Sequence, residues 1–122
     1  MGLDQYAYAR SDNQKIEDVE PVFVWRKHAK LQEWAENLFE DKTGQSATDL
    51  NCNELALDTE DISNLKAMIN ADDLPESPGG FFYGHQFQDE SAKEYREQDL
   101  EFCDWVLAQL KDGQPVFYSC WW

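Results

Sequence analysis

The sequence predicts an α+β fold, a single domain in which a mixed sheet of about four strands packs with three helices. Three observations support this class. Runs of β-branched and aromatic residues lie at both ends of the chain, segments with helical periodicity occupy the middle, and no linker divides the 122 residues into two domains. Aromatic residues make up 14% of the chain, and a disordered chain of this charge would be poor in them, so we expect residues 1–122 to share one core.

Four segments have the composition of strands. The alternation of tyrosine and alanine in residues 3–10 predicts a first strand. Residues 22–25 predict a short second strand or the start of a helix, and residues 50–57 predict a third strand whose register a bulge shifts. Residues 116–122 follow a turn signal at Gly113 and are apolar on both faces, which is typical of a central strand.

Two amphipathic helices are predicted over residues 26–42 and 59–72, where apolar side chains recur at three- and four-residue spacing. Gly44 is placed to end the first helix, because glycine readily adopts the left-handed conformation that follows many helices. Asp58 or Thr59 is placed to cap the second helix, since both side chains accept hydrogen bonds from the first backbone N–H groups.

A third helix is predicted over residues 91–111, after a short strand at residues 81–83. Ser91 and Glu94 have the spacing of a capping box. The apolar stripe of this helix consists of Tyr95, Phe102, Cys103, Val106, Leu107 and Leu110. A solvated helix face accounts for the carboxylates of the same region, which are Asp89, Glu90, Glu94, Glu97, Asp99 and Glu101.

The chain ends on two tryptophans, Trp121 and Trp122. Each indole would expose a large apolar surface in water, so we expect the end of the chain to lie inside the fold or against a partner. An exposed aromatic strand here could also pair with its copy in a symmetric homodimer.

The net charge of the chain limits the classes of partner that it can bind. Twenty-five acidic residues against 10 basic ones give a formal net charge of -15. This balance repels the phosphates of nucleic acids and anionic membrane surfaces, so we expect no direct nucleic-acid binding and no membrane association. No segment approaches the roughly 20 apolar residues that span a bilayer.

Three cysteines, Cys52, Cys103 and Cys120, are widely spaced and form no CxxC pair. The first residues lack the basic and apolar regions of a signal peptide. We therefore expect a cytoplasmic protein whose cysteines are buried, reduced thiols.

A ligand pocket is predicted where strand ends and a glycine loop would meet, because pockets form at such places. Its candidate residues are Asp4, Trp25, Arg26, His28, Tyr83, His85 and Tyr118. Arg26 would bind an anion, and a histidine would supply acid–base chemistry. Two structural alternatives stand beside this prediction. His28 lies three residues before Leu31 on the apolar stripe, as a packed histidine would, and residues 78–85 also fit a plain turn into a buried strand.

Metal and cofactor sites are not predicted. The histidines, cysteines and carboxylates do not have the spacing of HExxH, CxxC or EF-hand motifs. The glycine loop lacks the GxxxxGK[ST] pattern of phosphate-binding loops, and no GxSxG nucleophile elbow is present.

Four segments, MGLDQYAYAR, VWRKH, GGFFYG and VFYSCWW, resemble a group of small proteins of bacteriophages and some bacteria that begin near MGLDMYAY and end near YSSWW. In this chain Gln5 replaces the methionine and Cys120 a serine of those sequences. Some members carry the label phosphoglycerate kinase, which does not suit a chain too short for that two-domain enzyme. The resemblance implies a compact cytoplasmic protein, phage-encoded in some cases, and implies no catalytic residues.

Three functions are compatible with these features. The first is an acidic binding or modulator protein that acts through protein–protein contacts, indicated by the charge and by the lack of a complete catalytic motif. The second is a small-ligand or enzymatic site built from the candidate pocket residues. The third is a DNA mimic, whose carboxylates would be spaced like phosphates along one face.

Overall fold

The computed structural model describes residues 2–11, 13–78 and 85–122, with the side chains of Ile16 and His85 left aside. The predicted strand at residues 81–83 lies outside this range. Along the chain the strands and helices are β1 (Asp4–Ala9), β2 (Phe23–Arg26), α1 (Ala29–Thr43), β3 (Glu54–Leu57), α2 (Thr59–Asn70), α3 (Gln88–Lys111) and β4 (Val116–Trp121). Short 3-10 helices occupy Ile16–Asp18, Ala47–Leu50 and His85–Phe87.

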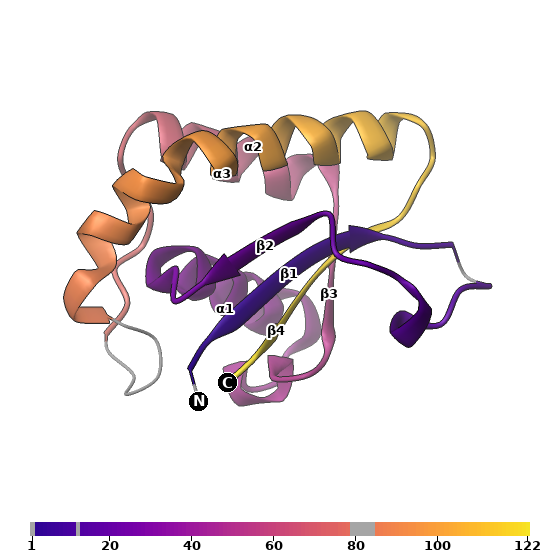
Figure 1. The fold of residues 1–122 in the computed structure, drawn as a ribbon, viewed down its shortest axis with the longest axis horizontal. Helices are drawn as coiled ribbons and strands as arrows, with labels where there is room; N and C mark the ends of the chain where they lie inside the picture. Colours follow the sequence, from indigo (N-terminus) through magenta and orange to yellow (C-terminus); the bar gives the residue numbers. More distant parts are fainter. Residues whose placement is uncertain (1, 12, 79–84) are drawn as a thin grey trace.

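The strands form one sheet in the order β2-β1-β4-β3, with the helices packed against it (Figure 1). The predicted α+β class with four strands and three helices is therefore confirmed. The prediction of a mixed sheet is wrong, because all three strand pairs are antiparallel. One parallel bridge, between Asn51 and Cys120, is isolated and belongs to none of these pairs. A parallel pair is usually joined by a single helix, whereas two helices, α2 and α3, separate β3 from β4.

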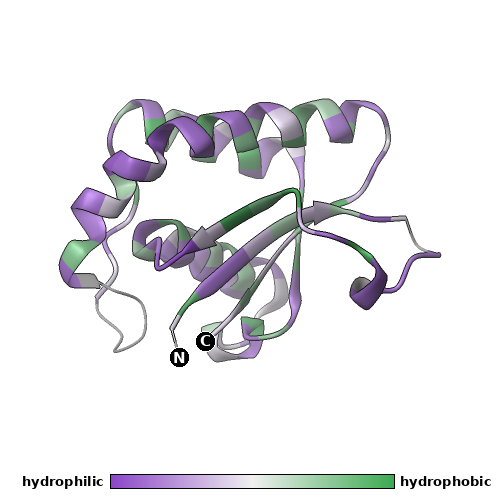
Figure 2. Ribbon diagram, in the orientation of Figure 1, coloured by the Kyte–Doolittle hydropathy of each residue, from purple (hydrophilic) through white to green (hydrophobic). Residues whose placement is uncertain are grey.

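The helices lie on one side of the sheet and leave the other side open (Figure 1). On the covered side the Trp25 ring meets the Phe102 ring of α3 edge-on, with centroids 5.0 Å apart. Leu31 of α1 and Leu65 of α2 are fully buried in the same core. Much of the visible surface of α3 is hydrophilic, whereas β2 changes from hydrophobic at its start to hydrophilic at its end (Figure 2).

The predicted ends of the first two helices are confirmed. Gly44 has φ 70° and its N–H donates to the Glu40 carbonyl, so it ends α1 in the left-handed conformation. Asp58 caps α2, because its carboxylate accepts from the Asp61 N–H while the Asp61 carboxylate accepts from the Asp58 N–H.

The third helix begins earlier than predicted. α3 starts at Gln88, and Phe87 precedes it without a side-chain cap. The capping box predicted from Ser91 and Glu94 is therefore wrong, since both residues already lie within the helix. Its apolar stripe is confirmed at Phe102 and Val106, which are fully buried.

The closing strand β4 is an inner strand of the sheet, as predicted, and it pairs with β1 on one side and with β3 on the other. A homodimer made by adding a copy to an edge of β4 is excluded, because both edges are already paired. The expectation that the chain end is sheltered holds in part. Trp122 is half-buried and its backbone N–H donates to Asn51 Oδ1 at 3.0 Å, whereas the Trp121 side chain is exposed.

The third strand is shorter than predicted. β3 begins only at Glu54, because residues 47–50 form a 3-10 helix and Cys52 has a left-handed φ of 65°. Among the described residues, no helix has the length and apolar character needed to cross a membrane.

Candidate functional site

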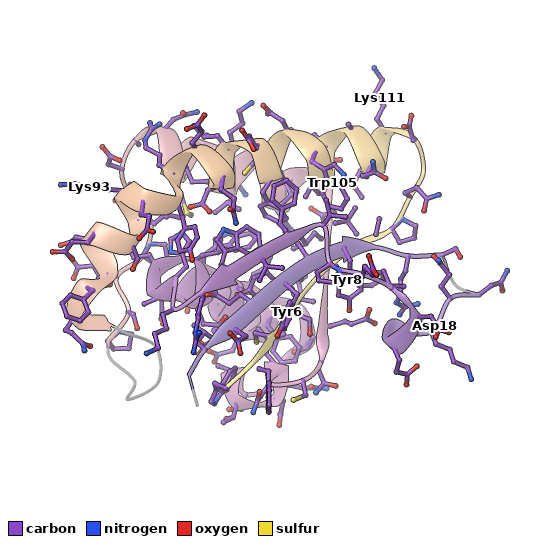
Figure 3. All side chains as sticks on the ribbon, in the orientation of Figure 1. Tyr6, Tyr8, Asp18, Lys93, Trp105 and Lys111 are labelled. Carbon is purple, nitrogen blue, oxygen red and sulfur yellow. The ribbon has the colours of Figure 1, made fainter. Side chains whose placement is uncertain are left out.

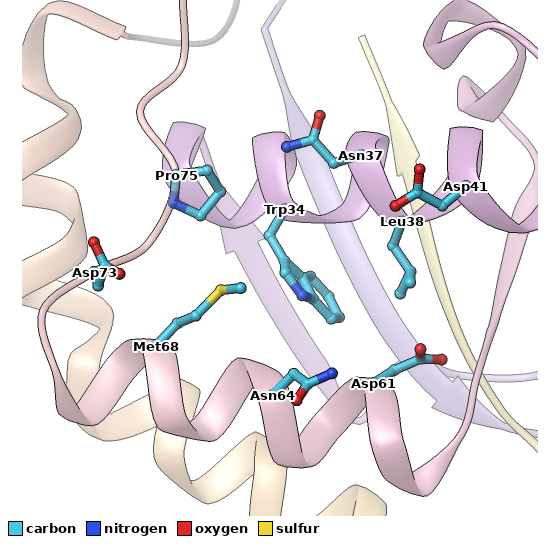
Figure 4. A pocket seen from close by; sticks show the side chains of 9 residues that line it. All are labelled: Trp34, Asn37, Leu38, Asp41, Asp61, Asn64, Met68, Asp73 and Pro75. Atoms are coloured by element: carbon cyan, nitrogen blue, oxygen red, sulfur yellow. The ribbon is translucent and has the colours of Figure 1, made fainter.

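A groove with a volume of about 290 Å³ lies between α1, α2 and the segment that follows α2 (Figure 4). It is lined by Trp34, Asn37, Leu38, Asp41, Asp61, Asn64, Met68, Asp73 and Pro75. Figure 4 shows the Trp34 indole in the middle of this α1–α2 groove, with the Met68 side chain reaching toward it from α2.

The floor of the groove is apolar because helical spacing brings the right side chains together. Trp34 and Leu38 are four residues apart and therefore share one face of α1. Met68 occupies the opposing face of α2, and Pro75 closes one end. Trp34 is almost completely buried, so its indole is held in place by the core while its exposed part forms the floor.

The rim of the groove is negatively charged. Asp61 already has a cation, since Lys42 Nζ contacts its carboxylate and also donates to the Ala56 carbonyl at 2.8 Å. Asp41 and Asp73 are exposed and form no ion pair with any described residue. An apolar floor beneath two uncompensated carboxylates suits a ligand with a hydrocarbon stem and a positive head.

A second polar cluster is buried between the sheet and α3. The Asp99 carboxylate accepts from Trp25 Nε1 at 2.8 Å and contacts His28 Nε2 at 2.7 Å. His28 and Asp99 are both fully buried, and the Tyr95 ring stacks on the imidazole with centroids 5.2 Å apart. This cluster joins β2 and the start of α1 to α3.

A third polar cluster crosses the sheet beneath α1. Gln5 Nε2 donates to the Tyr118 hydroxyl at 2.9 Å, and that hydroxyl donates to Gln32 Oε1 at 2.5 Å. Gln5 Nε2 also donates to the His28 backbone carbonyl, and the His28 backbone N–H donates to Gln5 Oε1. Gln5 and Gln32 are fully buried, so these bonds satisfy amide groups that water cannot reach.

The buried histidine has part of the equipment of a general base. His28 Nε2 faces a carboxylate, and His28 Nδ1 has no hydrogen-bond partner among the described residues. A general base must nevertheless reach its substrate, and the imidazole has no exposed surface. A cavity of about 40 Å³ beside Asp99, lined also by Lys30 and Arg96, is large enough for little more than water. The geometry therefore supports a structural role for His28, as its position on the apolar stripe indicated.

The predicted pocket residues lie on two sides of the sheet. Trp25, His28 and Tyr118 are buried on the helix-covered side. Asp4 and Arg26 lie on the open side, where they line a shallow hollow of about 160 Å³ and their side chains approach to 3.9 Å. The sheet separates these two groups. Tyr83 lies outside the described residues, and so does the side chain of His85.

Asp99 corrects one sequence interpretation. The sequence pattern predicts that it lies on a solvated carboxylate face, yet it is fully buried against Trp25 and His28. A signal was present, because Asp99 lies four residues after Tyr95 and three before Phe102, which places it on the apolar stripe of α3. No comparable signal marked the groove, whose residues come from two helices and a loop.

The cysteines differ in exposure. Cys103 and Cys120 are buried as predicted, and burial raises the pKa of each thiol to about 12, so neither is a thiolate at neutral pH. Cys52 is exposed, which corrects the prediction that all three are buried. Within the described residues, no three histidine, cysteine or carboxylate side chains are grouped to hold a metal ion.

The open side of the sheet carries a pair of charges packed on aromatic rings. Glu54 accepts from Arg10 at 2.6 and 2.8 Å and from the Tyr8 hydroxyl at 2.6 Å, while the Arg10 guanidinium lies 4.6 Å from the centre of the Phe117 ring. Hydrogen bonding from Arg10 holds the pKa of Glu54 below its ordinary value. Burial, reinforced by the Glu54 carboxylate, raises the pKa of Tyr8.

Comparisons of this chain with protein-family models, curated proteins and solved structures found no match.

Proposed function

We propose that this chain is an acidic binding protein whose α1–α2 groove receives a lysine or arginine side chain of a basic protein partner. The observation that carries the proposal is the groove itself, with Trp34 in its floor and the uncompensated carboxylates of Asp41 and Asp73 at its rim. The net charge of -15 supports it, because a strongly acidic surface speeds the approach of a basic partner.

Lys42 already illustrates this recognition within the chain. Its ammonium reaches Asp61, and its side chain is mostly buried up to that point. A partner's lysine or arginine would likewise lay its methylene stem on Leu38 and Met68 and bring its charged head to Asp41 or Asp73.

The test follows backbone amide chemical shifts by NMR during titration with three ligands. These are Nα-acetyl-lysine amide, Nα-acetyl-arginine amide and the uncharged Nα-acetyl-norleucine amide. We expect the two cationic ligands to shift the amides around Trp34, Leu38 and Met68. Norleucine amide keeps the hydrocarbon stem and lacks the charge, so it should shift them much less. Equal shifts from all three ligands would contradict recognition of the charge.

Paired variants separate the groove from the overall charge. The double variant Asp41→Asn, Asp73→Asn should weaken binding several-fold, since each exposed ion pair contributes about 0.2–1 kcal/mol. The control double variant Glu97→Gln, Glu101→Gln changes the net charge equally on exposed positions of α3. If both double variants weaken binding alike, the acidity acts without the groove.

A further inference from the structure

The open face of the sheet is defined by register. Asp4 is paired with Arg26 and Trp121, and Tyr6 is paired with Val24 and Ser119, so all of these side chains project to the side without helices. In Figure 3, Tyr6 and Tyr8 lie over the sheet on the side away from α1. This open face is distinct from the α1–α2 groove, which lies among the helices.

Exposed apolar side chains gather on or beside this face. Val24 is 50% exposed and Trp121 59% exposed, and Val22, just before β2, is 54% exposed. Among the described residues, the one other large hydrophobic side chain with comparable exposure is Phe87, at the start of α3. An apolar cluster of this kind is typical of an interaction surface.

The charges of the open face balance each other, unlike those of the whole chain. Arg26 lies beside Asp4, and Arg10 binds Glu54. A strongly basic partner therefore gains little from this face and much from the acidic helices. A second copy of the chain meets no net charge of its own sign from these two pairs.

The same face carries both a protruding ring and a hollow. The exposed Trp121 indole stands at one end. A hollow of about 220 Å³, lined by Tyr6, Tyr8, Val19, Pro21 and Ser119, lies farther along the sheet. A surface with its own knob and its own hole is suited to a twofold contact, in which each copy places its knob against the other copy's hole.

We propose that two copies of this chain associate through their open sheet faces as a symmetric homodimer. Val24 and Trp121 of each copy are buried in the contact. Face-to-face packing of sheets replaces the edge pairing of β4, which the sheet order excludes.

Salt distinguishes this contact from binding of a basic partner. Each copy carries a charge of -15, so the two copies repel each other outside the balanced face. Salt screens that repulsion and strengthens apolar burial, so dimerisation should tighten as salt rises. Binding of a cation in the α1–α2 groove should weaken under the same change, so each proposal can fail without the other.

Sedimentation velocity of the full chain, from about 1 µM to about 1 mM and at about 0.05 M and 0.5 M salt, tests the proposal. We expect a monomer–dimer equilibrium that shifts toward dimer at the higher salt. Val24→Glu and Trp121→Glu should each weaken dimerisation about tenfold or more, because both place a charge in the apolar contact. Phe87→Glu is the control, an equally exposed hydrophobic residue on another element. A monomer at every concentration and salt, or equal weakening by Phe87→Glu, overturns the proposal.

Discussion

The two faces of the sheet are made from the same four strands, yet they treat polar groups differently. On the covered face the polar side chains of Gln5 and Tyr118 bond to each other inside the core. On the open face the Arg10–Glu54 pair is about one-fifth exposed, and hydrophobic Val24 stands half in water. This difference indicates that the covered face contributes mainly to stability and the open face mainly to binding. Buried polar groups must find partners within the chain, so the covered face determines stability, whereas water tolerates mismatches on the open face and leaves it available for binding.

The largest expected effect is on the covered face, at Asp99. Asp99→Ala removes the acceptor shared by Trp25 and His28 and leaves a buried polar group of each without its partner, and each such group costs about 1–3 kcal/mol. We expect a large drop in the free energy of unfolding, measured by urea denaturation.

Asp99→Asn is the matched control for this change, because it keeps the shape of the side chain. The amide can still accept from Trp25 and donate to a neutral His28. It should therefore lose much less stability than Asp99→Ala. Equal stability of the two variants would show that the hydrogen bonds at Asp99 do not hold α3 to the sheet.

A smaller effect is expected at Tyr118, also on the covered face. Tyr118→Phe keeps the ring and removes the hydroxyl between Gln5 and Gln32, which leaves two buried amides short of a partner at a cost of about 1–3 kcal/mol. Tyr6→Phe removes a hydroxyl from the open face and should change stability little. Thermal melts of the two variants side by side measure the contrast, and similar melting temperatures would remove the proposed difference between the faces.

The smallest effect is expected on the open face, in the pH dependence of stability. Arg10 lowers the folded-state pKa of Glu54, so this carboxylate stabilises the fold above its ordinary pKa of 4.5. That stabilisation is lost as pH falls through the lowered pKa. For a partly exposed ion pair we expect about 1 kcal/mol or less.

Glu54→Gln should accordingly lose less stability than the original chain when pH falls from about 5 to about 3. Urea denaturation at several pH values measures the two slopes. Asp49→Asn, on the exposed 3-10 helix before β3, is a control that removes a carboxylate without an ion pair among the described residues. Parallel curves for Glu54→Gln and the original chain would show that the Arg10–Glu54 pair does not contribute to acid sensitivity.

The fold could be predicted further from sequence than the site could. The alternation around Tyr6 and Tyr8 correctly located β1, and Gly44 and Asp58 correctly marked helix ends. These signals are local, because a residue's neighbours at two, three or four positions decide its face. The start of α3 was missed, since Ser91 and Glu94 matched a capping pattern that the earlier start of the helix at Gln88 made irrelevant.

The described members of the candidate pocket do not all meet, for a related reason. Its members were chosen for their chemistry, but Trp25 and Arg26 are neighbours in a strand and so project to opposite faces. Alternation along β2 was enough to separate them. The α1–α2 groove, by contrast, depends on how two helices pack against each other. The periodic pattern of one helix does not predict that packing.

The sequence by itself determined the fold class, the type of most secondary-structure elements and the acidity of the surface. Periodicity over a few residues is enough for the elements, and composition is enough for the charge. The tertiary structure alone decided which groups meet. His28 finds Asp99 71 residues away, and Gln5 finds Tyr118 113 residues away. Such pairs form because folding removes water from both groups at once, and each must then be satisfied by whatever the packing brings beside it. The same packing left one face of the sheet without an α-helix and one groove open between helices.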